Sequence, residues 1–133
     1  MIFRGWLSAC CAPVLLPVLL VMGLGAGAAE DGALEELYGA IAYSPSNRAH
    51  GWSYDYPSRK DAEHRALAQC GRHAEDCVVP VWFRNACGAL AVGSDGYGSG
   101  WGSSRKSAEG QAVQSCRRYS GGCAVIRWVC TTR

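Results

Sequence analysis

Gly39-Ala40-Ile41-Ala42 opens a pattern that the chain uses twice, because it returns as Gly88-Ala89-Leu90-Ala91. A tandem repeat of this length predicts a fold built from two copies of one unit. The later parts of the pattern return in the same order: Gly51-Trp52-Ser53 as Gly100-Trp101-Gly102, Ser58-Arg59-Lys60-Asp61-Ala62-Glu63 as Ser104-Arg105-Lys106-Ser107-Ala108-Glu109, and Cys70, Cys77 and Trp82 as Cys116, Cys123 and Trp128.

The two copies differ slightly in length. The offset is 49 residues from Gly39 to Gly88, but only 46 from Cys70 to Cys116. The second copy therefore lacks about three residues. Aligning the two Gly-Trp pairs places the extra residues of the first copy near Tyr54-Asp55-Tyr56.

In each copy the pattern predicts a hairpin followed by a helix. Strands are expected at 38–43 and 49–54 in the first copy and at 88–92 and 97–101 in the second, each pair separated by turn-forming residues. Ser58 begins the first helix as an N-cap. Small residues then fall on one helical face, which allows the helix to lie close to a sheet.

A further apolar strand is expected after each helix, at 78–83 and 124–129. These strands are apolar on nearly both faces, which predicts central, covered positions. We therefore expect an α+β fold: a duplicated ββαβ unit with a mostly antiparallel sheet and two helices packed on it.

The N-terminal part of the chain has the order of a secretory signal peptide. Arg4 precedes an apolar stretch from Ala12 to Leu24, and small residues follow it. We expect a signal peptide at 1–29, a lead-in at 30–36, and one domain at 37–133 with repeats at about 38–84 and 87–130.

After cleavage of the signal peptide, we expect no segment that is apolar enough to span a membrane. The remaining 12 basic and 11 acidic residues are spread out, so no nucleic-acid partner is expected.

Six cysteines remain in the mature chain, and an even number in a small exported protein predicts a disulfide framework. The repeat pairs Cys70 with Cys77 and Cys116 with Cys123, which leaves Cys87 and Cys130 for each other. The spacings do not suit a zinc site, and no metal or cofactor is expected. The predicted location is oxidising, either periplasmic or secreted.

The segment from Tyr38 to Cys130 resembles the bacterial family of domain of unknown function 4189. The matching features are Tyr38-Gly39-Ala40-Ile41-Ala42, Gly51-Trp52-Ser53, the helix start Ser58-Arg59 with Ala62-Glu63, Cys70, Cys77, residues 81–91 (Val-Trp-Phe-Arg-Asn-Ala-Cys-Gly-Ala-Leu-Ala) and Trp128-Val129-Cys130. The resemblance implies a small exported bacterial protein, and it brings no established activity or catalytic residues.

Aromatic residues are the strongest candidates for a binding surface. Trp52, Tyr54 and Tyr56 alternate, so in an extended segment they would share one face. An exposed ridge of these residues beside Asp55 would suit protein or glycan binding. The alternative is that Trp52 packs in the core like Trp101, and the repetition of that position favours the core for both.

Arg84 and Asn85, which follow the third strand, form either a second contact pair or a turn.

These features favour an exported, disulfide-stabilised, non-enzymatic binding module whose partner is a protein or a cell-envelope component. Inhibitors and immunity proteins are analogous small exported modules. One alternative is a small envelope hydrolase that uses His50, Asp55 or nearby carboxylates. Another is a structural envelope component. The glycine-rich segment at 93–102 does not match a phosphate-binding loop.

Overall fold

A computed structural model describes residues 34–133 of the chain, so the expected signal peptide lies outside the described residues. The elements follow the predicted order twice. They are β1 (Tyr38–Tyr43), β2 (His50–Tyr56), α1 (Arg59–Cys70), β3 (Val78–Arg84), β4 (Cys87–Val92), β5 (Tyr97–Gly102), α2 (Arg105–Arg117) and β6 (Ala124–Cys130).

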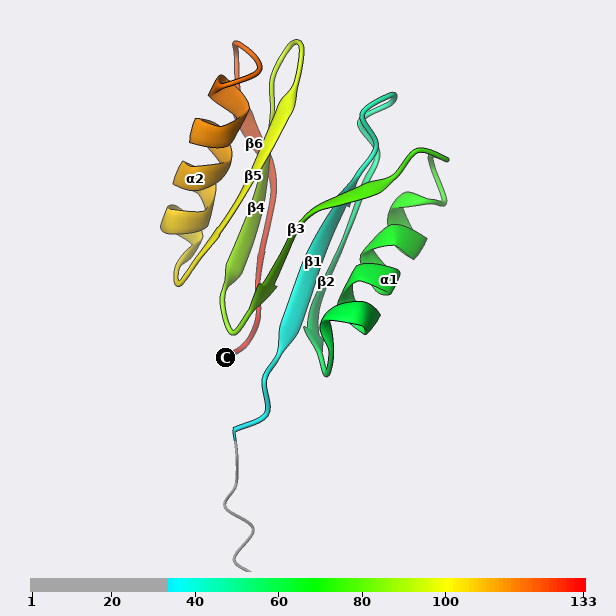
Figure 1. Ribbon diagram of the computed structural model, residues 1–133, viewed down its shortest axis with the longest axis vertical. Helices are drawn as coiled ribbons and strands as arrows, with labels where there is room; N and C mark the ends of the chain where they lie inside the picture. The colour runs from blue at the N-terminus through cyan, green and yellow to red at the C-terminus, as the bar shows by residue number, and fades with distance from the viewer. Residues whose placement is uncertain (1–33) are drawn as a thin grey trace, which may run out of the picture. The chain divides into compact units, whose positions relative to one another are not determined.

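Each repeat forms its own three-stranded antiparallel sheet (Figure 1). The strand order is β2-β1-β3 in the first sheet and β5-β4-β6 in the second. The duplicated α+β architecture is thus confirmed. The prediction that 78–83 and 124–129 are central strands is wrong, because β3 and β6 are edge strands. The central strands are β1 and β4, where alanine and glycine allow close packing on both faces.

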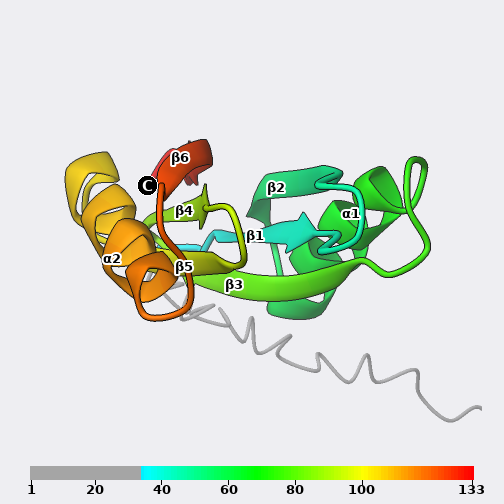
Figure 2. The same ribbon diagram turned by 90° about the horizontal axis from the view of Figure 1, so that it is seen from above.

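The two sheets pack face to face, and a helix covers the outer face of each (Figure 2). The layer between the sheets is the main core, in which Ile41, Phe83 and Leu90 are almost fully buried. Tyr43 also lies in this layer, and burial raises the pKa of its phenol above the ordinary value. The domain therefore has four layers, with a smaller buried cluster between each helix and its sheet and the shared core between the two sheets.

Small residues determine how closely α2 lies on its sheet. Gly98, Gly100 and Gly102 alternate along β5, and an added Cβ at Gly98 or Gly100 would overlap the backbone of α2. The buried helix positions Ala108 and Ala112 are small as well. Successive residues of a strand point to opposite faces, so the residues between these glycines face the other sheet.

Helix starts and disulfides agree with the predictions. The Ser58 hydroxyl accepts the Asp61 N–H at 3.1 Å, and the Ser104 hydroxyl accepts the Ser107 N–H at 3.2 Å. The disulfides are Cys70–Cys77, Cys116–Cys123 and Cys87–Cys130. The last pair joins directly opposed residues of β4 and β6. Three disulfides suggest a non-cytoplasmic, oxidising location.

Candidate functional site

Two open strand edges lie together on one side of the sandwich, and we call this side the β3/β5 flank. The Ser99 hydroxyl of β5 donates a hydrogen bond of 3.0 Å to the Pro80 carbonyl of β3. Beyond this bond a cavity of about 360 Å³ opens between the two strands. It is lined by Pro80, Val81, Trp82, Phe83, Arg84 and Trp101, and most of its lining is apolar.

Trp101 is the most exposed tryptophan in residues 34–133, at 58 % of its full surface. The alternating glycines hold β5 against α2, so Trp101 faces away from the helix and overhangs the cavity. Its predicted core position is therefore wrong. A large apolar side chain at the rim of an apolar cavity is typical of a binding surface.

A second cavity of about 440 Å³ continues along β5. It is lined by Pro80, by residues 96–99, by Ser115 in the last turn of α2 and by Tyr119 just after the helix. Pro80 lines both cavities, and we call the two together the β5 groove. The edge of β5 lies along this groove, with β3 on one side and α2 on the other.

Strand register decides which residues of the two repeats correspond. Ala40 is opposite Ser53 in the first sheet, and its counterpart Ala89 is opposite Gly100 in the second. Ser53 thus corresponds to Gly100, and the next residue, Tyr54, corresponds to Trp101. Trp52 corresponds to Ser99. The two Gly-Trp pairs that look alike in sequence therefore occupy different structural positions.

The opposite flank, where β2 lies beside β6, is filled by Arg127. Its guanidinium lies 3.7 Å from the centre of the Trp52 ring, and its Nη2 donates to His50 Nε2 at 3.2 Å. Since Nε2 accepts this bond, Nδ1 carries the proton and donates to the Arg48 carbonyl at 3.3 Å. Arg127 Nε is buried without a hydrogen-bond partner among the described residues. The two flanks are therefore equivalent in topology but different in chemistry.

The predicted aromatic ridge does not form on one face. Asp55 has a φ of 59° and lies in a bulge of β2, where Tyr38 is opposite Tyr56 although Ala40 is opposite Ser53. The extra residue turns Tyr56 toward α1, while Trp52 packs on the core between the sheets. Tyr54 is half exposed. Asp55 accepts the Thr132 N–H at 2.8 Å, which fastens the C-terminus to the bulge.

Arg84 and Asn85 contact residues that lead into the domain. Asn85 has a φ of 46°, and it exchanges two hydrogen bonds of 2.9 Å with the Leu37 backbone. Arg84 pairs with Glu36 at 3.2 Å, and about half of each side chain is exposed. Asn85 therefore has a turn and docking role within the chain, whereas Arg84 also lines the groove.

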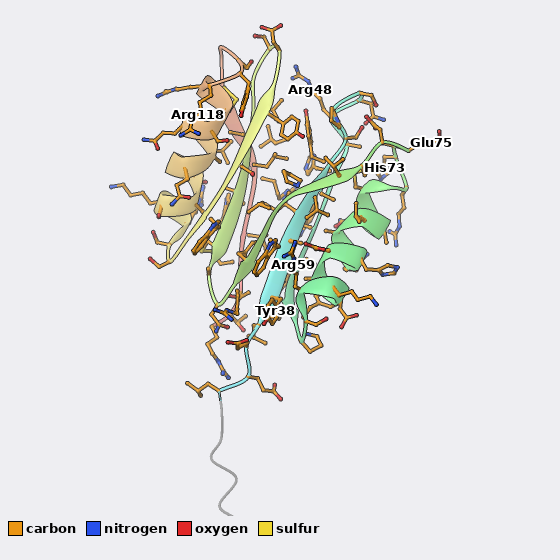
Figure 3. The ribbon with its side chains drawn as sticks, viewed as in Figure 1. Tyr38, Arg48, Arg59, His73, Glu75 and Arg118 are labelled. Carbon is orange, nitrogen blue, oxygen red and sulfur yellow. A yellow bond between two sulfur atoms is a disulfide. The ribbon has the colours of Figure 1, made fainter. Side chains whose placement is uncertain are left out.

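An arginine covers the outer tryptophan in each repeat. Arg59 lies 4.4 Å from the centre of the Trp82 ring and pairs with Glu63 at 2.7 Å, and Figure 3 shows Arg59 and Tyr38 beside β3. Arg105 covers Trp128 at 4.0 Å in the same way. Because both repeats carry this arrangement, it is part of the shared fold rather than of a single site.

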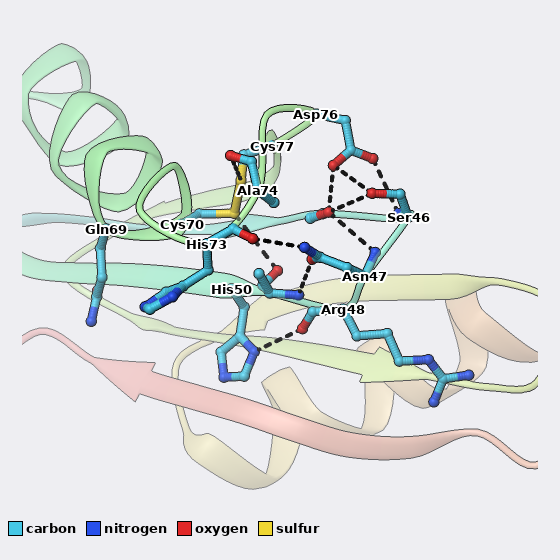
Figure 4. Close-up of a disulfide and its surroundings, with 12 residues drawn as sticks. Ser46, Asn47, Arg48, His50, Gln69, Cys70, His73, Ala74, Asp76 and Cys77 are labelled. Carbon is cyan, nitrogen blue, oxygen red and sulfur yellow. Dashed lines mark hydrogen bonds between the residues drawn. A yellow bond between two sulfur atoms is a disulfide. The ribbon is translucent and has the colours of Figure 1, made fainter.

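The loop that follows α1 holds the first hairpin turn (Figure 4). The Asp76 carboxylate accepts hydrogen bonds from the Ser44 hydroxyl and from the Ser46 N–H and hydroxyl, the last two at 3.1 and 2.9 Å. The Ser44 hydrogen bond is the main reason why the pKa of Asp76 lies below its ordinary value. Asn47 adds a bond of 2.7 Å to the His73 carbonyl. The Cys70–Cys77 disulfide closes this loop.

The acid–base pair considered for a hydrolase is not assembled. His50 begins β2 and bonds Arg127, whereas Asp55 lies near the other end of the strand, about 16 Å away at the usual rise per residue. Within residues 34–133, no three His, Cys, Asp or Glu side chains are placed to share a metal ion. Neither helix of this part has the length and hydropathy of a membrane span.

Residues 38–130 match the family described as "Domain of unknown function (DUF4189)". Similar curated proteins include Protein Rv1269c of Mycobacterium tuberculosis and Protein Mb1300c of Mycobacterium bovis, each 46 % identical over 67 residues. That match covers 50 % of this chain and 51 % of the relative, so it spans about half the length of these proteins. The NMR structure of Rv1813c from Mycobacterium tuberculosis is also similar, with a TM-score of 0.53 and 36 % identity, covering 71 % of this chain and 74 % of that one.

Proposed function

The chain belongs to the DUF4189 family, and on that premise we propose that it is an exported binding module that captures a partner protein on its β3/β5 flank. The apolar groove beside the exposed Trp101 carries this proposal. Large, rigid aromatic side chains bury much area on binding and lose little conformational entropy, so they often dominate binding energy.

The difference between the two flanks supports a single site. The repeats are equivalent in topology, but Arg127 and His50 fill the β2/β6 flank, while the β3/β5 flank has an open cavity. By analogy with small exported inhibitors and immunity proteins, the partner would be an envelope enzyme or toxin. The three disulfides suit this role, because they keep the module folded outside the cytoplasm.

Tyr54 provides a matched control for Trp101. It occupies the corresponding position on the other sheet and is exposed to a similar extent, 50 % against 58 %. It also belongs to the surface that the sequence favoured, together with Trp52, Asp55 and Tyr56. Trp101→Ala and Tyr54→Ala each remove one exposed aromatic side chain, so a difference between them distinguishes the two flanks.

The test is affinity capture from the envelope fraction and culture fluid of the producing organism, followed by mass spectrometry. The wild type and Tyr54→Ala should retain the same protein, and Trp101→Ala should retain about tenfold less of it. Circular dichroism should verify that both variants are folded. Loss of capture in Tyr54→Ala alone would move the site to the β2/β6 flank, and equal capture by all three would remove both flanks from consideration.

A further inference from the structure

The edge of β5 differs from the other three strand edges in residues 34–133. Its sequence, Tyr-Gly-Ser-Gly-Trp-Gly, contains no charge and no proline, and all six residues pair with β4 in regular register. By contrast, β2 has the bulge at Asp55, β3 contains Pro80, and β6 contains Arg127. Bulges, prolines and charges normally protect an edge strand from pairing with another chain. The edge of β5 has none of these protections.

This edge also lies along the β5 groove. Residues 96–99 line one cavity and Trp101 lines the other, so accessible space follows the strand along most of its length. As an edge strand, β5 pairs only with β4, so the backbone N–H and C=O groups on its other side have no strand partner among the described residues. An extended peptide in the groove can therefore form main-chain hydrogen bonds to β5. Its side chains alternate between two faces, and one of them can lie against Trp101.

We propose that the β5 groove binds an extended segment of the partner protein, which adds to the second sheet as a fourth strand next to β5. This inference rests on the proposed function and specifies how the partner is held. The segment is uncharged where it passes Gly98 and Gly100, and it places an apolar side chain beside Trp101. A carboxylate at one end of the segment meets Arg84.

The carboxylate follows from charge complementarity. Among the described residues that line the two cavities, Arg84 alone carries a charge. Its existing pair with Glu36 is half exposed and therefore weak, so a ligand carboxylate can join or replace it. An acidic side chain or a free C-terminus of the segment supplies the same group.

The size of the groove favours a peptide segment over a second copy of the chain. Six residues line one cavity and seven the other, and since Pro80 is shared, the lining comprises twelve residues. Stable protein–protein interfaces use about 20 to 30 residues on each side. A single extended strand fits the smaller surface.

The test uses a phage-displayed library of linear twelve-residue peptides, selected on the oxidised wild-type domain. We expect selected peptides to be rich in β-branched and aromatic residues and to carry one acidic residue near one end. For a synthetic selected peptide, N-methylation at alternate backbone amides on one edge should weaken binding about tenfold, while methylation of the other edge should have little effect. Bound peptide should slow hydrogen exchange of β5 amides and leave those of β2 unchanged.

Three variants locate the site. Trp101→Ala should weaken binding of the peptide about tenfold, and Arg84→Gln roughly fivefold, with the second effect vanishing for a peptide whose acidic residue is replaced by its amide. Tyr54→Ala should leave the affinity unchanged. If Trp101→Ala does not fold, Trp101→Phe serves instead, with a smaller expected loss.

Strand addition would be overturned if the peptides bind equally well with and without N-methylation. It would also be overturned if the β5 amides are protected from hydrogen exchange in a dimer without peptide, or if the domain binds envelope glycan fragments but selects no peptide. These failures differ from failure of the proposed function. If capture from the envelope depends on Trp101 while N-methylation has no effect, the proposal that the β3/β5 flank binds a partner is kept and strand addition is rejected. If capture does not depend on Trp101, the proposed function itself falls.

Discussion

Trp101 of β5 is the structural counterpart of Tyr54 of β2, although in sequence it looks like the counterpart of Trp52. The pairing of Ala40 with Ser53 and of Ala89 with Gly100 requires this correspondence. The three residues by which the repeats differ are therefore divided between two places. One is the bulge at Asp55, and the other two lie in the hairpin turn between β1 and β2. Tyr54 and Trp101 are both exposed, so exposure is a property of this strand position in both repeats.

Replacing Gly98 by alanine should destabilise the domain strongly. The new Cβ would overlap the backbone of α2 at Ala112 and Cys116, and a helix backbone cannot yield as a flexible side chain can. We expect a loss of about 3 kcal/mol in the free energy of unfolding, measured by urea denaturation under oxidising conditions. The control is Gly110→Ala on the exposed side of α2, where an added Cβ meets nothing within 4 Å. That change should stabilise the domain by about 1 kcal/mol, and a loss there would contradict the packing described.

The part of the fold that depends on local patterns was predictable from the sequence. The hairpins, the serine N-caps and the disulfide pairs all follow from residues that recur at fixed spacing. The face of the sheet to which each side chain points was harder to predict. It depends on the pairing register of the strands, and a single bulge reverses it. Asp55 turns Tyr56 to the helix side, which no alternation pattern indicates.

A usable signal for the orientation of Trp101 was nevertheless present in the glycines. Gly98, Gly100 and Gly102 mark the face of β5 that approaches a helix, so Trp101 had to face the other way. The identity of the two Gly-Trp pairs concealed this spacing. The cavity itself was not predictable, because it depends on how two edge strands from different sheets approach each other at Pro80 and Ser99.

Asp76 should make stability depend on pH in the acid range. Its pKa is lowered in the folded state, chiefly by the Ser44 hydrogen bond, so its contribution is present above the unfolded pKa of about 3.8 and is lost as the pH falls through the folded value. Asp76→Asn should therefore be less stable at neutral pH and should lose stability less steeply below pH 4. Urea titrations at a series of pH values measure both effects. The neighbouring exposed Glu75→Gln should retain the wild-type profile, and an unchanged profile in Asp76→Asn would contradict the role of the hydrogen bonds.

Arg127 should respond differently to two substitutions. Arg127→Met keeps a long side chain over Trp52 and removes the unpartnered buried Nε, so we expect a change in unfolding free energy of less than about 1 kcal/mol. Arg127→Ala also loses the packing on the indole ring and should cost about 2 kcal/mol. Chemical denaturation compares the two variants directly. An Arg127→Met variant as unstable as Arg127→Ala would mean that the charge, rather than the packing, stabilises this flank.

The three disulfides should contribute unequally. Cys87–Cys130 closes a separation of 43 residues, whereas Cys70–Cys77 closes one of 7. Chain-entropy arguments assign about 4 kcal/mol to the longer bridge and about 2.5 kcal/mol to the shorter. Replacing Cys87 and Cys130 together by serine should thus lower the urea midpoint more than replacing Cys70 and Cys77 together. The reverse order would show that holding the first hairpin turn in place contributes more to stability than closing the long loop.

The Cys87–Cys130 bridge also determines how the protein responds to a pulling force. Tension applied at Leu34 and Arg133 passes through the first repeat to Cys87, crosses the disulfide to Cys130 and leaves residues 88–129 outside the load path. Under load the first repeat can lengthen, except for the small loop closed by Cys70–Cys77, while the second keeps its end-to-end distance. The half that carries Trp101 is thus mechanically shielded, and reduction of this one bond would release most of residues 88–129 for extension.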